Sequence, residues 1–245
     1  MGKRPSVFSR ILNALSTDIG IDLGTANTLV YVRGKGIVLN EPTIVAINKK
    51  TGQLVAVGAD AKAMLGRTPH HIEVIRPLVD GVISDFEVTE EMLAYLINKV
   101  RSETRSLVAP RVWVGVPSGI TNVEMRAARD AAKNAGAREV LLIEEPMAAA
   151  IGAKLPVGKA IGNMIIDIGG GTTDIAVISL SGIVVAKNLR VAGDHLNAAI
   201  VAYIRDQFKV LVGDKTAEDA KIVLSSIVQH EDGKEMVVRG RDVVT

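Results

Sequence analysis

The stretch of sequence that decides the fold is IGIDLGTANTLVYV, residues 19–32, which is echoed by MIIDIGGGTTDIAVI, residues 164–178. In both stretches a strand-like run ends in an aspartate, a Gly-rich turn follows, and a second strand-like run leads away. A strand-turn-strand unit that recurs so far along the chain predicts two related halves that face each other across a cleft. Each half then contributes one Gly-rich hairpin.

Strand-like and helix-like patterns alternate along the rest of the chain, which is typical of α/β construction and not of a sandwich or a helix bundle. Strands are expected at residues 19–23, 28–33, 111–116, 140–143, 164–168 and 174–178. Helices are expected at residues 89–105, 121–135, 146–153, 194–210 and 216–228. Thr121 and Glu124 mark the start of the second helix as a capping box.

The composition excludes several classes of protein. The 245 residues are 48% hydrophobic, so the chain can bury a substantial core. The 29 basic and 27 acidic side chains leave a formal net charge of +2, and therefore no nucleic-acid partner is expected. The chain has no cysteine, its four histidines lack metal-ligand spacing, and no apolar run reaches the ~20 residues that span a bilayer. We expect a cytoplasmic protein whose membrane contact is peripheral.

The two Gly-rich turns are candidate phosphate-binding sites, because glycine lets backbone N–H groups approach and surround phosphate oxygens. The candidate contacts are Gly24, Thr25, Ala26 and Asn27 in the first turn, and Gly169, Gly170, Gly171, Thr172 and Thr173 in the second. Asp22 and Asp167 precede the two turns, and carboxylates beside phosphate oxygens suit Mg²⁺. The alternative is that each turn is only a tight hairpin, but two such turns in register favour the phosphate site.

The sequence lacks two other phosphate-binding motifs, the GxxxxGK[ST] P-loop and a GxGxxG between a strand and a helix. Between the two turns, VLLIEEPMAAAIGAKLPV (residues 140–157) delivers Glu144 and Glu145 to the start of a helix. Glu145 is a candidate for orienting or deprotonating a water that attacks the γ-phosphate of a nucleotide. The alternative is that Glu145 complements the dipole at the helix N-terminus.

Three of these motifs together resemble a known superfamily. IDLGTANT resembles the first phosphate motif of the actin, Hsp70 and sugar-kinase superfamily, IEEPMAAAIG resembles its first connecting motif, and IDIGGGTTDIAV resembles its second phosphate motif. Over residues 18–245 the sequence resembles that of the MreB family of rod-shape-determining bacterial actin homologues. The resemblance implies an α/β, actin-like (ribonuclease H-like) fold of duplicated domains around a nucleotide cleft, with small inserted subdomains.

The resemblance also implies ligands and roles for the matching residues. It implies ATP as the nucleotide, Mg²⁺ near Asp22 and Asp167, and water activation by Glu145 together with Thr172. AEDAKIVLSS, residues 217–226, is similar to the superfamily helix that holds the adenosine. Its Glu218 and Lys221 lie three apart on one helix face, although a surface ion pair explains that spacing as well. Gly193, in AGDHLN, resembles the turn near the nucleotide sugar.

The domain organisation follows from the same comparison. Residues 1–17 are expected to be an amphipathic membrane-targeting segment, and residues 18–154 a first actin-like domain with a small insertion at about 38–79. Residues 155–245 are expected to be an incomplete second domain, with a small subdomain from about 193. Members of the family continue through a second connecting helix and a Gly-rich adenine loop, so the resemblance implies a C-terminally truncated chain.

Three functions compete within the superfamily: a filament-forming, slow ATPase, a small-molecule kinase of the sugar-kinase type, and an Hsp70-like ATPase. The size of the predicted insertion favours the filament protein, which in the MreB family determines rod cell shape by organising cell-wall synthesis. The resemblance implies that its partners are further copies of itself in paired protofilaments, the inner face of the cell membrane and the cell-wall elongation machinery.

The N-terminal segment supports a membrane partner. A helix there would place Phe8, Ile11, Leu12 and Leu15 on one face, near basic residues that suit an anionic bilayer. The alternative is a helix docked on its own domain. A second candidate membrane contact is formed by Leu107 and Val108, on a loop.

Val123 is a candidate for a contact between protofilaments. It falls on a charged face of the helix expected at residues 121–135, where a valine is expected to be exposed. A surface valine without a role is the alternative.

Overall fold

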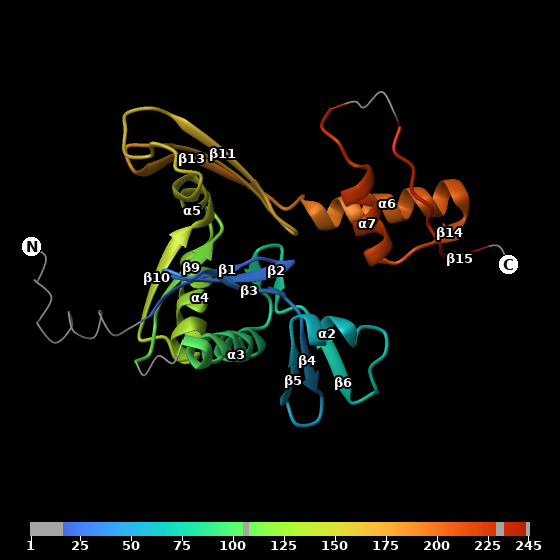
Figure 1. Cartoon of the computed structure of the whole chain (residues 1–245), viewed down its shortest axis with the longest axis horizontal. Coiled ribbons are helices and arrows are strands. Elements are labelled where there is room, and N and C mark those ends of the chain that lie inside the picture. Colours follow the sequence, from blue (N-terminus) through green and yellow to red (C-terminus); the bar gives the residue numbers. More distant parts are fainter. Residues whose placement is uncertain (1–16, 105–107, 229–232, 244–245) are drawn as a thin grey trace, which may run out of the picture. The chain divides into compact units, whose positions relative to one another are not determined.

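The computed structural model describes residues 17–104, 108–228 and 233–243. By its internal contacts the chain divides into two compact units, Met1–Arg190 and Val191–Thr245. Figure 1 labels most of the helices and strands of both units. The domain limits expected from the sequence stay predictions.

The first unit is built on a five-stranded mixed sheet, whose strands lie in the order β10-β9-β1-β2-β3. The strands are β1 (Asp18–Leu23), β2 (Asn27–Val32), β3 (Gly36–Pro42), β9 (Arg111–Val116) and β10 (Glu139–Glu144). β1, β9 and β10 run parallel, whereas β2 and β3 are joined to β1 by antiparallel pairing. The mixed sheet therefore combines a hairpin meander with parallel strands whose connections are helical.

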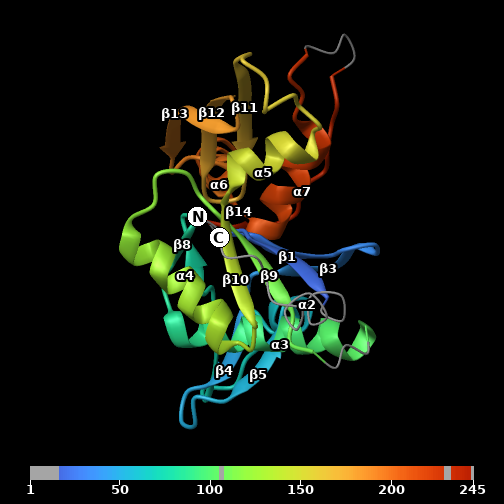
Figure 2. The same ribbon diagram turned by 90° about the vertical axis from the view of Figure 1, so that its left-hand side faces the viewer.

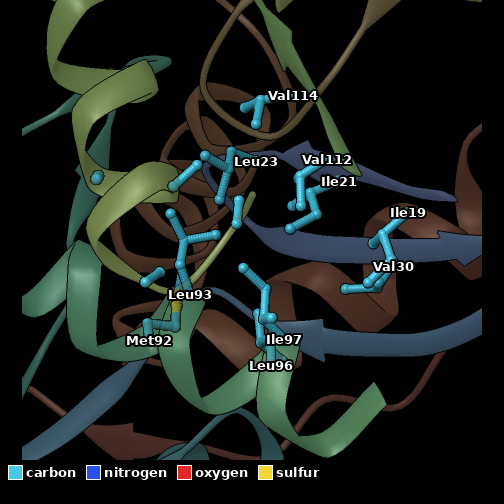
Figure 3. Packing of buried hydrophobic residues seen from close by; sticks show 14 of the residues in the cluster. Ile19, Ile21, Leu23, Val30, Met92, Leu93, Leu96, Ile97, Val112 and Val114 are labelled. Atoms are coloured by element: carbon cyan, nitrogen blue, oxygen red, sulfur yellow. The ribbon is translucent and has the colours of Figure 1, made fainter. Parts of the chain in front are cut away.

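Two helices cover one face of this sheet: α3 (Phe86–Thr104) and α4 (Asn122–Asn134) (Figure 2). The sheet residues that face the helices alternate along each strand, which is the period-2 pattern of a half-buried sheet. They pack against one face of α3, as Figure 3 shows for Met92, Leu93, Leu96 and Ile97. All four are at most 1% exposed, so truncating one to alanine would cost about 2–5 kcal/mol of the free energy of unfolding.

A second sheet of the first unit carries the echo of the opening motif. It has three antiparallel strands, β11 (Asn163–Ile168), β12 (Thr173–Ser179) and β13 (Gly182–Leu189). The helix α5 (Glu145–Gly152) packs against β11 and β12 and also contacts β10, so it links the two sheets. A small core of Ala150, Ala176 and Ile178 lies beneath it.

Two smaller pieces complete the first unit. A three-stranded sheet in the order β5-β4-β6 consists of β4 (Val45–Asn48), β5 (Leu54–Val57) and β6 (Ile72–Ile75), and α2 (Ala59–Ala63) packs on it. A hairpin of β7 (Leu78–Val79) and β8 (Val82–Ile83) turns at Asp80 and Gly81, which both have positive φ. An Asp-Gly pair is the residue choice for such a two-residue turn.

The second unit contains two helices that pack on each other, α6 (Gly193–Phe208) and α7 (Asp214–Leu224). A short antiparallel pair accompanies them, formed by β14 (Val210–Leu211) and β15 (Arg241–Asp242).

The predicted α/β class is confirmed, and every expected strand and helix is present with ends that shift by a few residues. The capping box is formed as predicted: the Thr121 Oγ1 accepts a hydrogen bond from the Glu124 N–H, and Glu124 accepts one from the Thr121 N–H. α3 begins at Phe86 instead of residue 89, because Asp85 caps it by accepting a hydrogen bond from the Val88 N–H.

Candidate functional site

The first Gly-rich turn joins β1 to β2 and is held in shape from behind by a threonine. The Thr43 hydroxyl donates to the Gly24 carbonyl oxygen over 2.7 Å, and the Thr28 hydroxyl donates in turn to Thr43. The Thr43 N–H also donates to the Ala26 carbonyl oxygen over 3.0 Å. These hydrogen bonds fix the shape of the first turn from the side of Thr43.

The second turn joins β11 to β12 and meets the first turn directly. It is closed by the Gly169 N–H, which donates to the Thr172 carbonyl oxygen over 2.9 Å. A Cβ atom added at Gly170 would lie 2.6 Å from the Cβ of Ala26, and one at Gly171 would lie 2.8 Å from the Thr25 hydroxyl oxygen. Only glycine allows the two turns to approach this closely.

The two turns border a cavity of about 370 Å³. Its walls contain most of the site residues predicted in this unit: Asp22, Gly24, Thr25, Ala26, Asn27, Glu145, Asp167, Gly169, Gly170, Gly171 and Thr172. Thr173 lies next to the wall as the first residue of β12. Residues about 140 positions apart in the sequence are therefore brought to one place.

Acidic side chains dominate the chemistry of this cavity. Burial is the main cause that raises the pKa of Glu145 from 4.5 to about 8, and three neighbouring aspartates add to the shift. Burial likewise raises the pKa of Asp22, with a smaller contribution from the charge of Asp167. The pKa of Asp167 is raised by burial and then by the charge of Asp174.

This lining fits a cation together with a polyphosphate. Among the described residues, the lining has four carboxyl groups and no lysine or arginine, so these residues offer a phosphate chain N–H donors but no positive charge. Within the described residues no group of three or more carboxylates or histidines has the spacing of a metal site. Mg²⁺ suits such a place, because it is usually held by one or two carboxylates, with waters and phosphate oxygens as the remaining ligands.

The structure adds lining residues that the sequence interpretation missed. Gly81, at the tip of the β7–β8 hairpin, donates its N–H to the Thr25 hydroxyl over 2.9 Å, and a Cβ there would lie 3.2 Å from the Thr172 methyl group. The Asp-Gly pair in PLVDGVI was the available signal. Asp174 also lines the cavity, five residues after Gly169 in the second motif.

The predicted adenosine residues lie together in the second unit. Lys221 Nζ lies 2.7 Å from Glu218 Oε2 and donates to the Gly193 carbonyl oxygen over 3.3 Å. Glu218 Oε2 also accepts from the side-chain amide of Asn197 over 2.6 Å. The ion pair expected from the spacing is therefore present, and its lysine side chain is only 18% exposed.

Of the residues predicted to contact the membrane or another filament, the structure describes Val108 and Val123. Phe8, Ile11, Leu12, Leu15 and Leu107 lie outside the described residues. Val108 is described and partly buried, whereas Val123 on α4 is 77% exposed. Among the described helices, none is long and apolar enough to cross a membrane.

The chain is similar to known proteins in both sequence and structure. A family model described as MreB/Mbl protein matches residues 16–245. The cell shape-determining protein MreB of Pasteurella multocida (strain Pm70) is 53% identical over 243 residues, which cover 97% of this chain and 69% of the relative. The chain belongs to the MreB/Mbl family.

Solved structures agree with membership of the MreB/Mbl family. The crystal structure of MreB5 of Spiroplasma citri bound to ADP superposes with a TM-score of 0.85 at 42% identity, covering 94% of this chain and 69% of that one. A double helical filament of MamK gives a TM-score of 0.73 at 22% identity, covering 89% and 67%. The MamK match shows the fold alone, and the predicted actin-like fold of the MreB/Mbl chain is confirmed.

Proposed function

We propose that this chain is the ATP-binding part of an actin-like filament protein that assembles at the inner face of the cell membrane and determines rod cell shape by organising cell-wall synthesis. The observation that supports it most is the pair of contacting Gly-rich turns around a cavity whose described lining has carboxyl groups and no basic side chain. The MreB5 relative was crystallised with ADP and with AMPPNP, and the sequence relatives are cell shape-determining proteins.

In the proposed phosphate site, backbone groups and side chains have different roles. The turns at residues 24–27 and 169–173 contact the phosphate oxygens, and the candidate donors are their backbone N–H groups other than that of Gly169, which bonds to Thr172. Asp22 and Asp167 would hold Mg²⁺, which would offset the negative charge of the phosphates. The positive charge of Mg²⁺ would offset the neighbouring aspartates that help to raise the pKa of Glu145, so that its ionised carboxylate could accept a proton from the attacking water. The Thr172 hydroxyl orients that water. Hydrolysis is slow and is coupled to filament assembly.

In the second unit, we propose that Glu218 and Lys221 contact the ribose and base of ATP and that Gly193 lies near its sugar. Asn197 positions the Glu218 carboxylate through the 2.6 Å hydrogen bond. Lys221 is fixed at the same time by the Gly193 carbonyl, so its ammonium group is already oriented before a ligand binds.

Sedimentation tests the filament proposal against the other members of the superfamily. The protein should pellet with Mg-ATP and stay in the supernatant without nucleotide, because assembly depends on the nucleotide-bound state. A sample with ATP and EDTA is the control for the metal. Equal pelleting in all samples, or transfer of phosphate to an added sugar, would contradict the proposal.

The exposed valine of α4 gives a prediction about filament pairing. Val123→Glu should abolish paired filaments while ATP affinity stays unchanged, because a charge at a buried contact between copies costs more than a lost methyl group. Electron micrographs of negatively stained filaments are the measurement. Glu87→Gln on α3 is a charge-changing control away from this face, and normal pairs in the Val123 variant would dispose of the contact.

The N-terminal segment gives a prediction about membranes. Phe8→Glu combined with Leu12→Glu should release the protein from liposomes of anionic lipid, because the apolar face of the helix expected from the sequence is lost while its basic residues remain. Flotation in a density gradient is the measurement, and Ser6→Glu with Ser9→Glu adds the same charge to the polar face as a control. Equal flotation of the Phe8/Leu12 variant and the parent would refute the assignment.

A further inference from the structure

Asp174 is a buried carboxylate to which the proposed mechanism gives no role. It lies on β12 and is only 2% exposed. One of its oxygens accepts hydrogen bonds from the backbone N–H of Ser118, over 3.0 Å, and from the Ser118 hydroxyl, over 2.5 Å. The other oxygen accepts from the side-chain amide of Asn188 over 2.7 Å. We call Ser118, Asp174 and Asn188 the carboxylate joint.

The carboxylate joint connects the five-stranded sheet of the first unit to its β11-β12-β13 sheet. Ser118 is 3% exposed and lies in the turn that leads from β9, in the five-stranded sheet, to α4. Asp174 and Asn188 are register partners on β12 and β13, in the three-stranded sheet. Because Asp174 follows the second Gly-rich turn directly, its anchoring to Ser118 fixes where that turn stands relative to the five-stranded sheet.

Burying the Asp174 carboxylate costs free energy, and this cost is explained if the carboxylate is needed to hold the second Gly-rich turn in place. Asp174 lies directly opposite Asp167 in the β11–β12 pair, and like charges in that arrangement repel. A buried carboxylate also loses its hydration, which only hydrogen bonds offset. Three donors at Asp174 supply that compensation, and bonds to a carboxylate are shorter and more directional than neutral ones. An apolar residue would fill the space without the repulsion, but it could not accept the hydrogen bonds from Ser118 and Asn188.

The fit of the two turns shows why small displacements matter. Gly170 and Gly171 approach Ala26 and Thr25 so closely that a single added carbon would collide. A shift of the second turn by a fraction of an ångström therefore changes the cavity that the two turns share. Attack geometry is more sensitive to such a shift than binding is, since a misplacement of 1 Å can lower a rate by about 10²-fold.

We propose that Asp174 is a positioning residue, whose hydrogen bonds to Ser118 and Asn188 hold the second Gly-rich turn, with Thr172 and Asp167, in the place that nucleotide hydrolysis requires. This inference rests on the proposed ATPase function. Asp174 borders the cavity, but Ser118 and Asn188 occupy both of its oxygens, so its role is to hold the turn.

The test compares Asp174→Ala with Asp174→Asn in the full-length protein. Asparagine keeps the shape, and a rotated Asn188 amide can accept from it, so the joint survives without its charge. Asp174→Ala should lower phosphate release at saturating Mg-ATP by at least about tenfold and change the affinity for a fluorescent ATP analogue by less than about threefold. Asp174→Asn should retain most of the rate. Equal loss in both variants would assign the effect to the charge and overturn the positioning role.

Hydrogen exchange in the nucleotide-free protein separates this inference from the proposed function. Asp174→Ala should speed amide exchange in peptides that cover residues 167–174 and 117–120, whether or not the protein hydrolyses ATP. Parental exchange in those peptides would overturn the joint. If the parent protein binds no ATP, the proposed function is wrong, but the result of the exchange experiment is unaffected.

Two further variants keep the test decisive if Asp174→Ala does not fold. Ser118→Ala removes the hydroxyl bond and leaves the N–H bond, so a smaller rate loss in the same direction is expected. Asn188→Ala is matched by Asn163→Ala, which removes the same side chain from the start of β11, where its amide bonds only to the Ile161 and Ile178 carbonyl oxygens. Equal effects of the two asparagine variants would count against the joint.

Discussion

Replacing Glu145 with alanine should slow phosphate release by roughly 10²-fold or more while the affinity for Mg-ATP changes little. The carboxylate is proposed to take a proton from water only as the γ-phosphate is attacked, so its loss raises the barrier and leaves the bound state nearly as it was. Thr172→Ala should act in the same direction and more mildly. If hydrolysis destabilises the polymer, the Glu145 variant should also form longer-lived filaments.

The neighbouring glutamate supplies a matched control. Glu144 ends β10 and is exposed, whereas Glu145 lines the cavity. Glu144→Ala makes the same chemical change one residue away and should hydrolyse ATP at the parental rate. A phosphate-release assay and titration with a fluorescent ATP analogue on the same preparations decide the matter. A parental rate for Glu145→Ala with a slow Glu144→Ala would transfer the catalytic role to Glu144.

The raised pKa of Glu145 predicts a pH dependence of stability with a definite sign. In the folded, nucleotide-free protein this carboxyl group keeps its proton up to about pH 8, whereas in the unfolded chain it releases it near 4.5. The folded state therefore binds more protons between those values, and the free energy of unfolding falls as pH rises through them. Glu145→Gln cannot ionise, so its stability advantage over the parent should grow from about pH 5 to about pH 8 in thermal unfolding. A constant difference would contradict the assignment.

The sequence predicted the parts of the fold that depend on local pattern. The two Gly-rich hairpins were predicted because each strand, aspartate and turn is contiguous, and the α4 capping box was predicted because its partners lie three residues apart. The end of α7 was wrong: the helix stops at Leu224, not at residue 228. Ser226 exchanges hydrogen bonds with the backbone of Val228, which competes with further helix.

The rest of the cavity could not be predicted because it depends on contacts between distant segments. Asp174 looks like a polar residue of an ordinary strand until Ser118, 56 positions away, is seen to donate to it twice. The contact of Gly81 with Thr25 joins residues 56 positions apart as well. Hydrophobic periodicity assigns residues to faces of their own element, but it does not say which loop of another element meets them.

Removing either candidate metal ligand should have opposite effects with and without the metal. Asp22→Ala and Asp167→Ala should each weaken Mg-ATP affinity by at least roughly 10–100-fold, since that is the usual loss when only an outer partner of a metal ligand is removed. In EDTA the same variants should bind ATP as well as the parent or better. The reason is that the cavity lining, in the part of the chain that the structure describes, has carboxyl groups and no basic side chain, so each aspartate repels the phosphates when no cation lies between them.

Thermal stability in the absence of metal provides a second test of the charges on Asp22 and Asp167. The pKa of Asp22 and that of Asp167 are both raised in the folded state, so ionising either carboxyl group near neutral pH works against folding. Asp167→Asn should therefore unfold at a higher temperature than the parent in EDTA, and added Mg²⁺ should narrow or reverse the difference, because it stabilises the parent in proportion to its binding. Asp60→Asn, at an exposed position on α2, is the matched control.

Equal loss of ATP affinity in Mg²⁺ and in EDTA would instead assign the two aspartates a structural role without a metal.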